Sequence, residues 1–164
     1  MAAMKEKKSL KVILGCLVVG MGLIGAGQFY GGWRPCSLCR YQQYIYLAAS
    51  ILSALGLFAP APALARGILA SVGGILLLNA GVAFYQVGVE QQWFPLPSFC
   101  KIEASSGMTV EALREQLLGS PVVRCDKPMV HILGLSLACY SFLFSCVLGG
   151  MGLTCALSHR SRKA

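Results

Sequence analysis

The chain is built from long uncharged, apolar runs that are separated by short charged segments. Asp, Glu, Lys and Arg are absent from four stretches, namely residues 12–33, 41–65, 67–89 and 128–159. Each stretch exceeds the roughly 20 residues that a helix needs to cross the apolar part of a bilayer. The pattern therefore predicts four transmembrane helices, at about residues 10–30, 41–59, 65–87 and 129–157.

On one side of the membrane, two loops connect these helices: residues 31–40 and residues 88–128. In the second loop Thr109 is a typical helix N-cap and Gly119 a typical stop signal. Between them, one face of the predicted helix carries the apolar side chains of Val110, Leu113 and Leu117. We expect a short amphipathic helix that lies on the membrane surface. The predicted fold is an all-α membrane protein, a four-transmembrane-helix bundle that forms a single domain over residues 1–164.

The first apolar run also has features of a secretory signal peptide, because the basic segment from Lys5 to Lys11 precedes it. The run continues uncharged to Trp33 and contains no clear cleavage site. We therefore expect it to be retained as the first transmembrane helix, in which Gly22 allows another helix to approach closely. In the third helix the polar side chain of Asn79 predicts a hydrogen bond between helices.

Composition agrees with a membrane protein, and the distribution of charge orients it. Of the 164 residues, 56% are hydrophobic and 12% are charged, whereas soluble domains carry about 25% charged residues. The net charge of +8 is concentrated at the two termini and at Arg66, while the outer loops are nearly balanced. By the positive-inside rule both termini and the turn at 60–66 are cytoplasmic. No basic patch is interleaved with aromatic residues, so nucleic-acid binding is excluded.

The eight cysteines fall into two groups. Four lie within the predicted helices, where we expect them to pack as small apolar side chains: Cys16, Cys139, Cys146 and Cys155. The other four lie in the outer loops, on the oxidising side of a bacterial membrane: Cys36, Cys39, Cys100 and Cys125. Four cysteines allow three pairings. The C-x-x-C spacing favours a Cys36–Cys39 bond, which leaves Cys100 with Cys125.

The Cys36–Cys39 pair is typical of redox chemistry. So small a ring restricts the unfolded chain very little, whereas C-x-x-C motifs combine a stabilised thiolate with a resolving sulfur. Arg34 and Arg40 flank the pair, and Cys39 is expected at the N-terminus of the second helix, where the helix dipole lowers a thiol pKa. A Cys100–Cys125 bond is equally compatible with a structural role.

Other uses of C-x-x-C fit less well. Residue 40 is arginine, so the C-x-x-C-H haem-attachment motif is absent. Cys100 and Cys125 form no second C-x-x-C, which argues against zinc, and we expect no metal site. A redox dithiol needs an electron acceptor, and the membrane itself supplies lipophilic quinone near Cys39. The residues alone therefore predict a membrane thiol oxidoreductase, with its direction open.

Three stretches resemble the DsbB family of bacterial disulfide bond formation proteins. They are residues 34–42 (RPCSLCRYQ), residues 85–90 (YQVGVE), and Cys125-Asp126 together with residues 133–136 (LGLS). The resemblance covers nearly the whole chain. It implies a multi-pass enzyme of the bacterial inner membrane that generates protein disulfides, with the outer cysteines in the periplasm.

The resemblance also implies a role for each outer cysteine. A thioredoxin-like periplasmic thiol oxidase of the DsbA type arrives reduced and forms a mixed disulfide with Cys100. Cys125 then exchanges with Cys36, and Cys39 passes the electrons to membrane quinone, either ubiquinone or menaquinone.

Quinone contacts are implied at Arg40, Gln42 and Gln43. The family usually has arginine at the position of Gln43, four residues after the second C-x-x-C cysteine. Here a neutral amide replaces that charge, and we expect Arg40 to compensate for it.

Two other hypotheses remain open at the level of sequence. One is a non-catalytic four-helix membrane protein with two structural disulfides. The other is an enzyme similar to quinone or vitamin K epoxide reductases, in which electrons flow in the opposite direction. The short loop at 31–40 and the separate Cys100/Cys125 pair favour oxidation.

Overall fold

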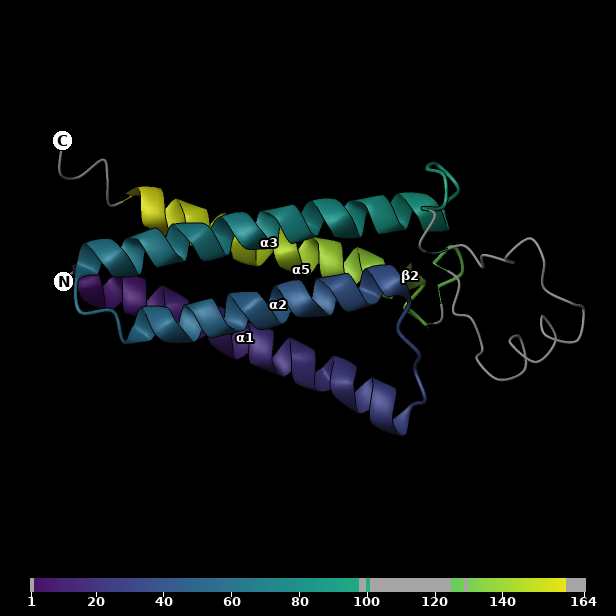
Figure 1. Ribbon diagram of the computed structural model, residues 1–164, viewed down its shortest axis with the longest axis horizontal. Helices are drawn as coiled ribbons and strands as arrows, with labels where there is room; N and C mark the ends of the chain where they lie inside the picture. Colours follow the sequence, from purple (N-terminus) through teal and green to yellow (C-terminus); the bar gives the residue numbers. More distant parts are fainter. Residues whose placement is uncertain (1, 98–99, 101–124, 129, 159–164) are drawn as a thin grey trace, which may run out of the picture.

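Four long helices run side by side in the computed structural model, which describes residues 2–97, 100, 125–128 and 130–158 (Figure 1). The elements are α1 (Ala2–Tyr30), α2 (Ser37–Leu57), α3 (Pro62–Glu90), β1 (His131–Ile132), β2 (Leu135–Ser136) and α5 (Leu137–Ser158). The predicted amphipathic helix at 109–119 lies outside the described residues. The start of α1 and the end of α5 lie at the same end of the bundle.

Three of the described helices are long and apolar enough to cross a membrane: Glu6–Tyr30, Pro62–Glu90 and Leu137–Ser158. The chain is thus a multi-pass membrane protein. The remaining helix, α2, has 21 residues, but Arg40, Gln42 and Gln43 make its first turns polar. A fourth span at α2 therefore remains a prediction.

The fourth predicted helix is wrong at its start, because a β-hairpin occupies residues 131–136. Strand β1 pairs antiparallel with β2, with His131 opposite Ser136. The two residues of the turn, Leu133 and Gly134, have φ values of 52° and 82°. Positive φ at both central residues is the requirement of a two-residue hairpin turn, and glycine meets it without steric cost. Helix α5 consequently begins at Leu137.

Helices α3 and α5 pack closely because small residues lie at their contact. A Cβ atom added to Gly73 would lie 2.9 Å from the backbone nitrogen of Leu153, and one added to Gly152 would lie 3.1 Å from the Cα atom of Gly73. Close backbone approach through small residues is a common way for membrane helices to associate. Nearly two turns further along, Asn79 donates a hydrogen bond to Ser145 Oγ at 3.0 Å. The predicted polar contact between helices is confirmed.

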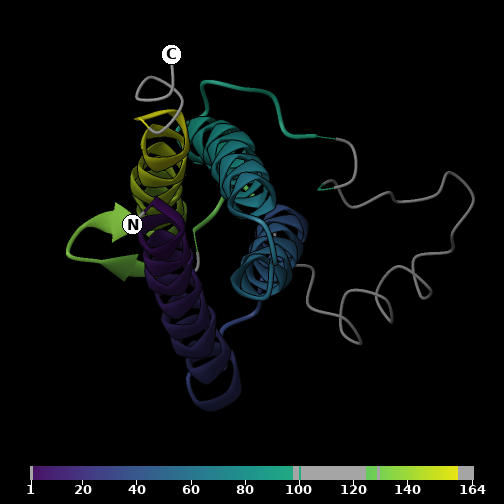
Figure 2. The same ribbon diagram turned by 90° about the vertical axis from the view of Figure 1, so that its left-hand side faces the viewer.

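Helix α1 packs in the bundle only over its first half. Leu10, Ile13 and Leu17 are buried in the core, whereas Leu23 is 68% exposed and Phe29 83% exposed. In both ribbon views the second half of α1 diverges from the other helices (Figures 1 and 2). The expected close approach at Gly22 is wrong, since a Cβ atom there would meet open space.

An ion pair joins the buried start of α1 to α3. Arg66 Nε donates to Glu6 Oε1 at 3.0 Å, and the Glu6 side chain is fully buried. A buried carboxylate is stable only when paired. The contact therefore fixes the first half of α1 against the bundle and leaves the second half free to diverge.

Candidate redox site

Cys36 and Cys39 lie at the start of α2, where the loop after α1 meets the bundle. Cys36 is the N-cap residue, and its Sγ atom accepts a hydrogen bond from the backbone nitrogen of Cys39 at 3.3 Å. Unpaired backbone N–H groups in the first turn give this helix end a partial positive charge. Both sulfurs therefore lie where a thiolate is stabilised, as the sequence predicted for Cys39.

The two sulfurs lie 2.8 Å apart as free thiols that share a hydrogen bond. The thiol of Cys36 lowers the pKa of Cys39 from its ordinary value of 9.0 to about 7, although burial opposes the shift. For Cys36 the same hydrogen bond, together with burial, raises the pKa above its ordinary value. The pair therefore loses its first proton from Cys39, while Cys36 keeps its own.

A short segment after α3 carries Cys100 back to this helix end. Phe94 lies over Gly88, where an added Cβ atom would approach the ring to 2.1 Å. The Phe94 ring stacks on Tyr85 with centroids 5.5 Å apart, and the Tyr85 hydroxyl donates to the carbonyl oxygen of Pro95 at 3.0 Å. These contacts turn the chain toward α2 and place Cys100 in the interior.

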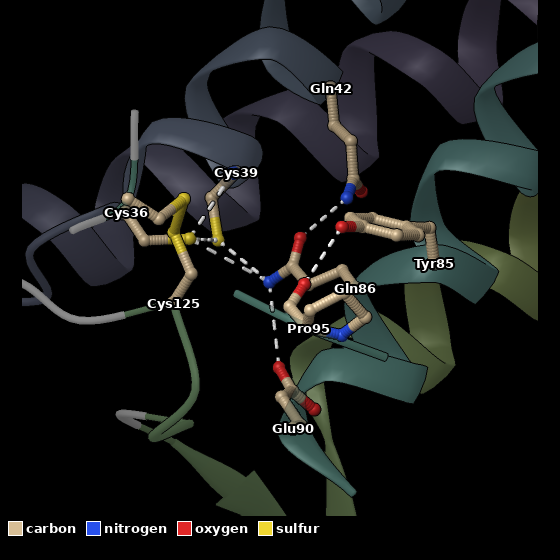
Figure 3. Close-up of a disulfide and its surroundings, with 9 residues drawn as sticks. Cys36, Cys39, Gln42, Tyr85, Gln86, Glu90, Pro95 and Cys125 are labelled. Carbon is tan, nitrogen blue, oxygen red and sulfur yellow. Dashed lines mark hydrogen bonds between the residues drawn. A yellow bond between two sulfur atoms is a disulfide. The ribbon is translucent and has the colours of Figure 1, made fainter. Parts of the chain in front are cut away.

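The four outer cysteines form one cluster in the described structure. Cys100 and Cys125 are joined by a disulfide, with Cα atoms 5.9 Å apart. Both are buried, and they pack together with Cys36 and, at its edge, Cys39 (Figure 3). A small cavity of about 60 Å³ is lined by Cys36, Cys39 and Cys125. The disulfide and the dithiol thus lie in one packed cluster.

Gln86 of α3 is the polar side chain that contacts both thiols. Its Nε2 atom lies 3.1 Å from Cys39 Sγ and 3.7 Å from Cys36 Sγ. Its Oε1 atom accepts a hydrogen bond from Gln42 Nε2 at 2.7 Å, and Glu90 Oε1 lies 3.5 Å from its Nε2 (Figure 3). The amide therefore presents a donor to the thiol that ionises first.

A large cavity of about 710 Å³ adjoins Cys39. It lies where α1 diverges, and most of its walls are apolar side chains of α1 and α5. The polar residues among its described lining are Cys39, Gln42, Gln43, Tyr46, Gln86, Tyr140 and Ser141. A cavity of this size that is mostly apolar, with few polar groups, is typical of a binding site for a small organic molecule.

The structure brings together most of the predicted site residues. Gln42 and Gln43 line the large cavity beside Cys39, but Arg40 is exposed and is not among the lining residues. The other cysteines, Cys16, Cys139, Cys146 and Cys155, are free thiols on α1 and α5. Among the described residues, no group of three His, Cys, Asp or Glu side chains is arranged to hold a metal ion.

Sequence reasoning missed the roles of Gln86, Tyr46 and Ser141. Polar residues inside an apolar helix were the available signal. Asn79 was recognised by that signal, and the same reasoning applied to Gln86 and Tyr46 would have predicted interhelical hydrogen bonds.

Comparison with known proteins identifies the family to which this site belongs. The model of the family described as "Disulfide bond formation protein DsbB" matches residues 7–155. The chain belongs to the DsbB family. Its membership makes the cysteine cluster that of a bacterial inner-membrane oxidoreductase that forms disulfides. The resemblance inferred from three short stretches is thereby confirmed over nearly the whole chain.

Among curated proteins the chain is similar to the uncharacterized protein RP370 of Rickettsia prowazekii (strain Madrid E). The two are 23% identical over 145 residues, which cover 87% of this chain and 83% of the relative. No solved structure matches the chain.

Proposed function

We propose that the chain reoxidises a thioredoxin-like thiol oxidase of the DsbA type and passes the electrons to membrane quinone. One observation carries the proposal. Cys39 packs with the other three outer cysteines on one side and lines the large apolar cavity on the other. In this proposal the cysteine cluster faces the bacterial periplasm, and both chain termini face the cytoplasm.

Two disulfide exchanges bring a pair of electrons from the partner to the C-x-x-C motif. A partner thiolate attacks Cys100 and releases Cys125 as a thiolate, and the partner's second thiolate then frees Cys100 and leaves with its own disulfide. The Cys125 thiolate attacks Cys36 of an oxidised Cys36–Cys39 pair. Cys100 then attacks Cys125, which restores their disulfide and leaves Cys36 and Cys39 reduced. This is the arrangement of bonds present in the structure.

The residues around the large cavity fit a quinone. Its volume of about 710 Å³ lies within the range of roughly 300–1,000 Å³ that is usual for small-molecule sites. Apolar walls suit a lipophilic ring, and Gln42 and Gln43 are the groups that would hold its oxygens. When bound, a quinone accepts two electrons and two protons. The Cys39 thiolate supplies the nucleophilic sulfur, and Cys36, whose proton is held until last, closes the disulfide.

The site argues against purely structural disulfides. A purely structural disulfide does not require one of its cysteines to ionise easily. Here the two free thiols lie 2.8 Å apart, and Cys39 has a pKa of about 7. Lowered thiol pKa values beside a cavity are typical of reactive cysteines. The reverse direction of electron flow uses the same groups, so an experiment has to separate the two directions.

The decisive experiment is a reconstituted assay. Full-length protein in lipid nanodiscs is mixed with a reduced DsbA-type protein and either ubiquinone or menaquinone. We expect the partner to lose its free thiols and one quinol to form for each partner disulfide. Reduction of an oxidised partner by quinol, with no net activity in the forward direction, would refute the proposal.

Single substitutions test the order of transfer in the same assay. Serine at position 36, 39, 100 or 125 should abolish steady turnover, because each sulfur passes electrons to the next. Matched controls are Cys146→Ala and Cys155→Ala, which remove thiols from α5 far from the cluster in sequence and should leave turnover intact. Full turnover in any of the four serine variants would contradict the relay.

A further inference from the structure

A chain of buried and half-buried polar side chains runs from the dithiol into the apolar centre of the bundle. It crosses repeatedly between α2, α3 and α5, and each member is hydrogen-bonded to the next. The members are, in order, Cys39, Gln86, Gln42, Ser141, Tyr46, Ser145 and Asn79. Burying so many polar groups in an apolar interior costs free energy of folding. Their presence therefore calls for a functional explanation.

The orientation of the Gln86 amide is fixed by its neighbours. On one side it meets the sulfurs of Cys39 and Cys36 and a carboxylate oxygen of Glu90, all of which act as acceptors when ionised. On the other side it meets the NH₂ group of Gln42, which only donates. The NH₂ group of Gln86 must therefore face the sulfurs.

Counting protons fixes the direction of the remaining bonds. The Oε1 atom of Gln42 can only accept, so Ser141 donates its single hydroxyl proton to it. Tyr46 must then donate to Ser141 Oγ, at 2.8 Å, with the carbonyl oxygen of Ser141 as a second, more distant acceptor at 3.2 Å. Ser145 must donate to Tyr46, at 2.7 Å. Asn79 donates its NH₂ group to Ser145. Every bond in the chain therefore points the same way, toward Cys39.

The far end of the chain agrees with this direction. The Oδ1 atom of Asn79 is buried and finds no hydrogen-bond partner among the described residues. The negative end of the row of dipoles thus lies in the apolar interior, and the positive end lies at the sulfur. Hydrogen bonds in a row polarise one another, and a low local dielectric strengthens their effect.

The charged residues near Cys39 do not line the large cavity. Arg34 and Lys127 line the small cavity and are both exposed, so solvent and salt screen them. Glu90 is acidic and disfavours a thiolate. No charged residue is among the described lining of the large cavity, where Gln43 is neutral. On that side only dipoles are available to stabilise negative charge.

We propose that this aligned chain of donors stabilises the Cys39 thiolate on its cavity side and replaces the positive charge that Gln43 does not provide. The inference deepens the proposed function and depends on it for the identity of the electron acceptor. Gln86 touches the reacting sulfur. Gln42, Ser141, Tyr46, Ser145 and Asn79 act through it as positioning residues.

The test measures the ionisation of Cys39 without quinone or partner. Full-length protein is reduced, and the rate at which iodoacetamide alkylates Cys39 is followed against pH, with the modified sulfur located by mass spectrometry. Gln86→Leu should raise the midpoint by about one pH unit, because it removes a hydrogen bond that the charged thiolate accepts. Tyr46→Phe and Ser145→Ala should raise it by progressively smaller amounts.

Ser53→Ala is the matched control. Ser53 is as buried as Ser145, but its hydroxyl donates to the carbonyl oxygen of Ala49 in its own helix and is not part of the chain. Its substitution should leave the midpoint unchanged. Tyr46→Phe and Ser145→Ala each remove one oxygen atom, so the test remains decisive if Gln86→Leu does not fold.

Two outcomes would overturn the inference. One is a shift with Gln86→Leu but none with Tyr46→Phe or Ser145→Ala, which would confine the effect to a single local bond. The other is an equal shift with Ser53→Ala, which would indicate a general effect of packing. An ordered series of shifts in a protein that reduces no quinone would support the donor chain and refute the proposed acceptor instead.

Discussion

The two thiols of the C-x-x-C motif have different tasks because their surroundings differ. Cys39 lies in the first turn of α2, receives hydrogen bonds from Cys36 and Gln86, and borders the large cavity. Cys36 is buried beside the Cys100–Cys125 disulfide. The first thiol is prepared to ionise toward the cavity, while the second is positioned to exchange with the disulfide.

Removing the donor thiol should therefore make Cys39 less acidic. Because the Cys36 hydrogen bond is the largest cause of the lowered pKa of Cys39, we expect Cys36→Ala to raise the midpoint of Cys39 alkylation above 7. At neutral pH fewer molecules then carry the thiolate, and alkylation slows. Cys36→Ser keeps a hydroxyl donor and should shift the midpoint less. An equal midpoint in the wild type and the alanine variant would contradict this division of tasks.

Substitutions at Gln43 and Arg40 test which of the two residues contacts quinone in the large cavity. Gln43 borders the cavity, so Gln43→Ala should weaken quinone use by about tenfold at most, the equivalent of one neutral hydrogen bond. Gln43→Arg should strengthen quinone use, because a charged donor contributes more than a neutral one. Quinone-dependent rates decide the matter. If Arg40→Ala impairs those rates more than Gln43→Ala, Arg40 contributes to quinone use although it does not line the cavity.

At the level of single residues, the reactive cysteines could be predicted from the sequence, whereas the polar side chains around them could not. The C-x-x-C motif predicts a reactive thiol, because spacing alone places Cys36 and Cys39 within one helical turn. Gln86 and Tyr46 could be seen as polar residues in apolar helices, but their hydrogen-bond partners depend on how three helices pack. That packing follows from contacts distant in sequence, which no local pattern contains.

The elements of the fold are of two kinds, those that follow hydrophobic length and those that follow turn chemistry. Lengths of apolar sequence predicted the three long membrane helices, α1, α3 and α5, to within a few residues, except that α1 already begins at Ala2 and α5 begins only at Leu137. That start was wrong because residues 131–136 are as apolar as a helix, while the Leu133-Gly134 turn folds them into a hairpin. Hydropathy does not distinguish an apolar hairpin of this kind from an apolar helix.

The segment after α3 depends on one close contact. A Cβ atom at Gly88 would displace the Phe94 ring that holds this segment against Tyr85. Overpacking of this kind costs about 1–3 kcal/mol. We therefore expect Gly88→Val to slow partner-dependent quinone reduction severalfold, since Cys100 is displaced, while quinone reduction driven by dithiothreitol changes little. Gly81→Val, at a position of α3 that faces open space, is the control. Equal losses in both assays would refute the explanation.

At the scale of the whole molecule, the proposed function has the bundle join a water-soluble partner to a lipid-soluble acceptor through one buried cluster. In that proposal electrons enter at Cys100 and leave at Cys39, so the sulfurs are not interchangeable. With Cys125→Ser, Cys100 is a free thiol that opens the disulfide of the oxidised partner, and a mixed disulfide should accumulate on a non-reducing gel because Cys125 can no longer displace the partner. With Cys100→Ser it should be scarce. Equal trapping by the two variants would contradict the assignment of Cys100 as the entry point.

The divergence of α1 has a consequence for how the acceptor arrives. Leu23, Leu143 and Val147 line the large cavity and are also exposed, so its mouth opens sideways among apolar side chains. A lipophilic molecule can then enter by lateral diffusion within one leaflet and never cross water. Its arrival becomes a two-dimensional search, and the concentration that sets the rate is its mole fraction among the lipids. Adding empty vesicles at constant total quinone would therefore slow the enzyme by dilution alone.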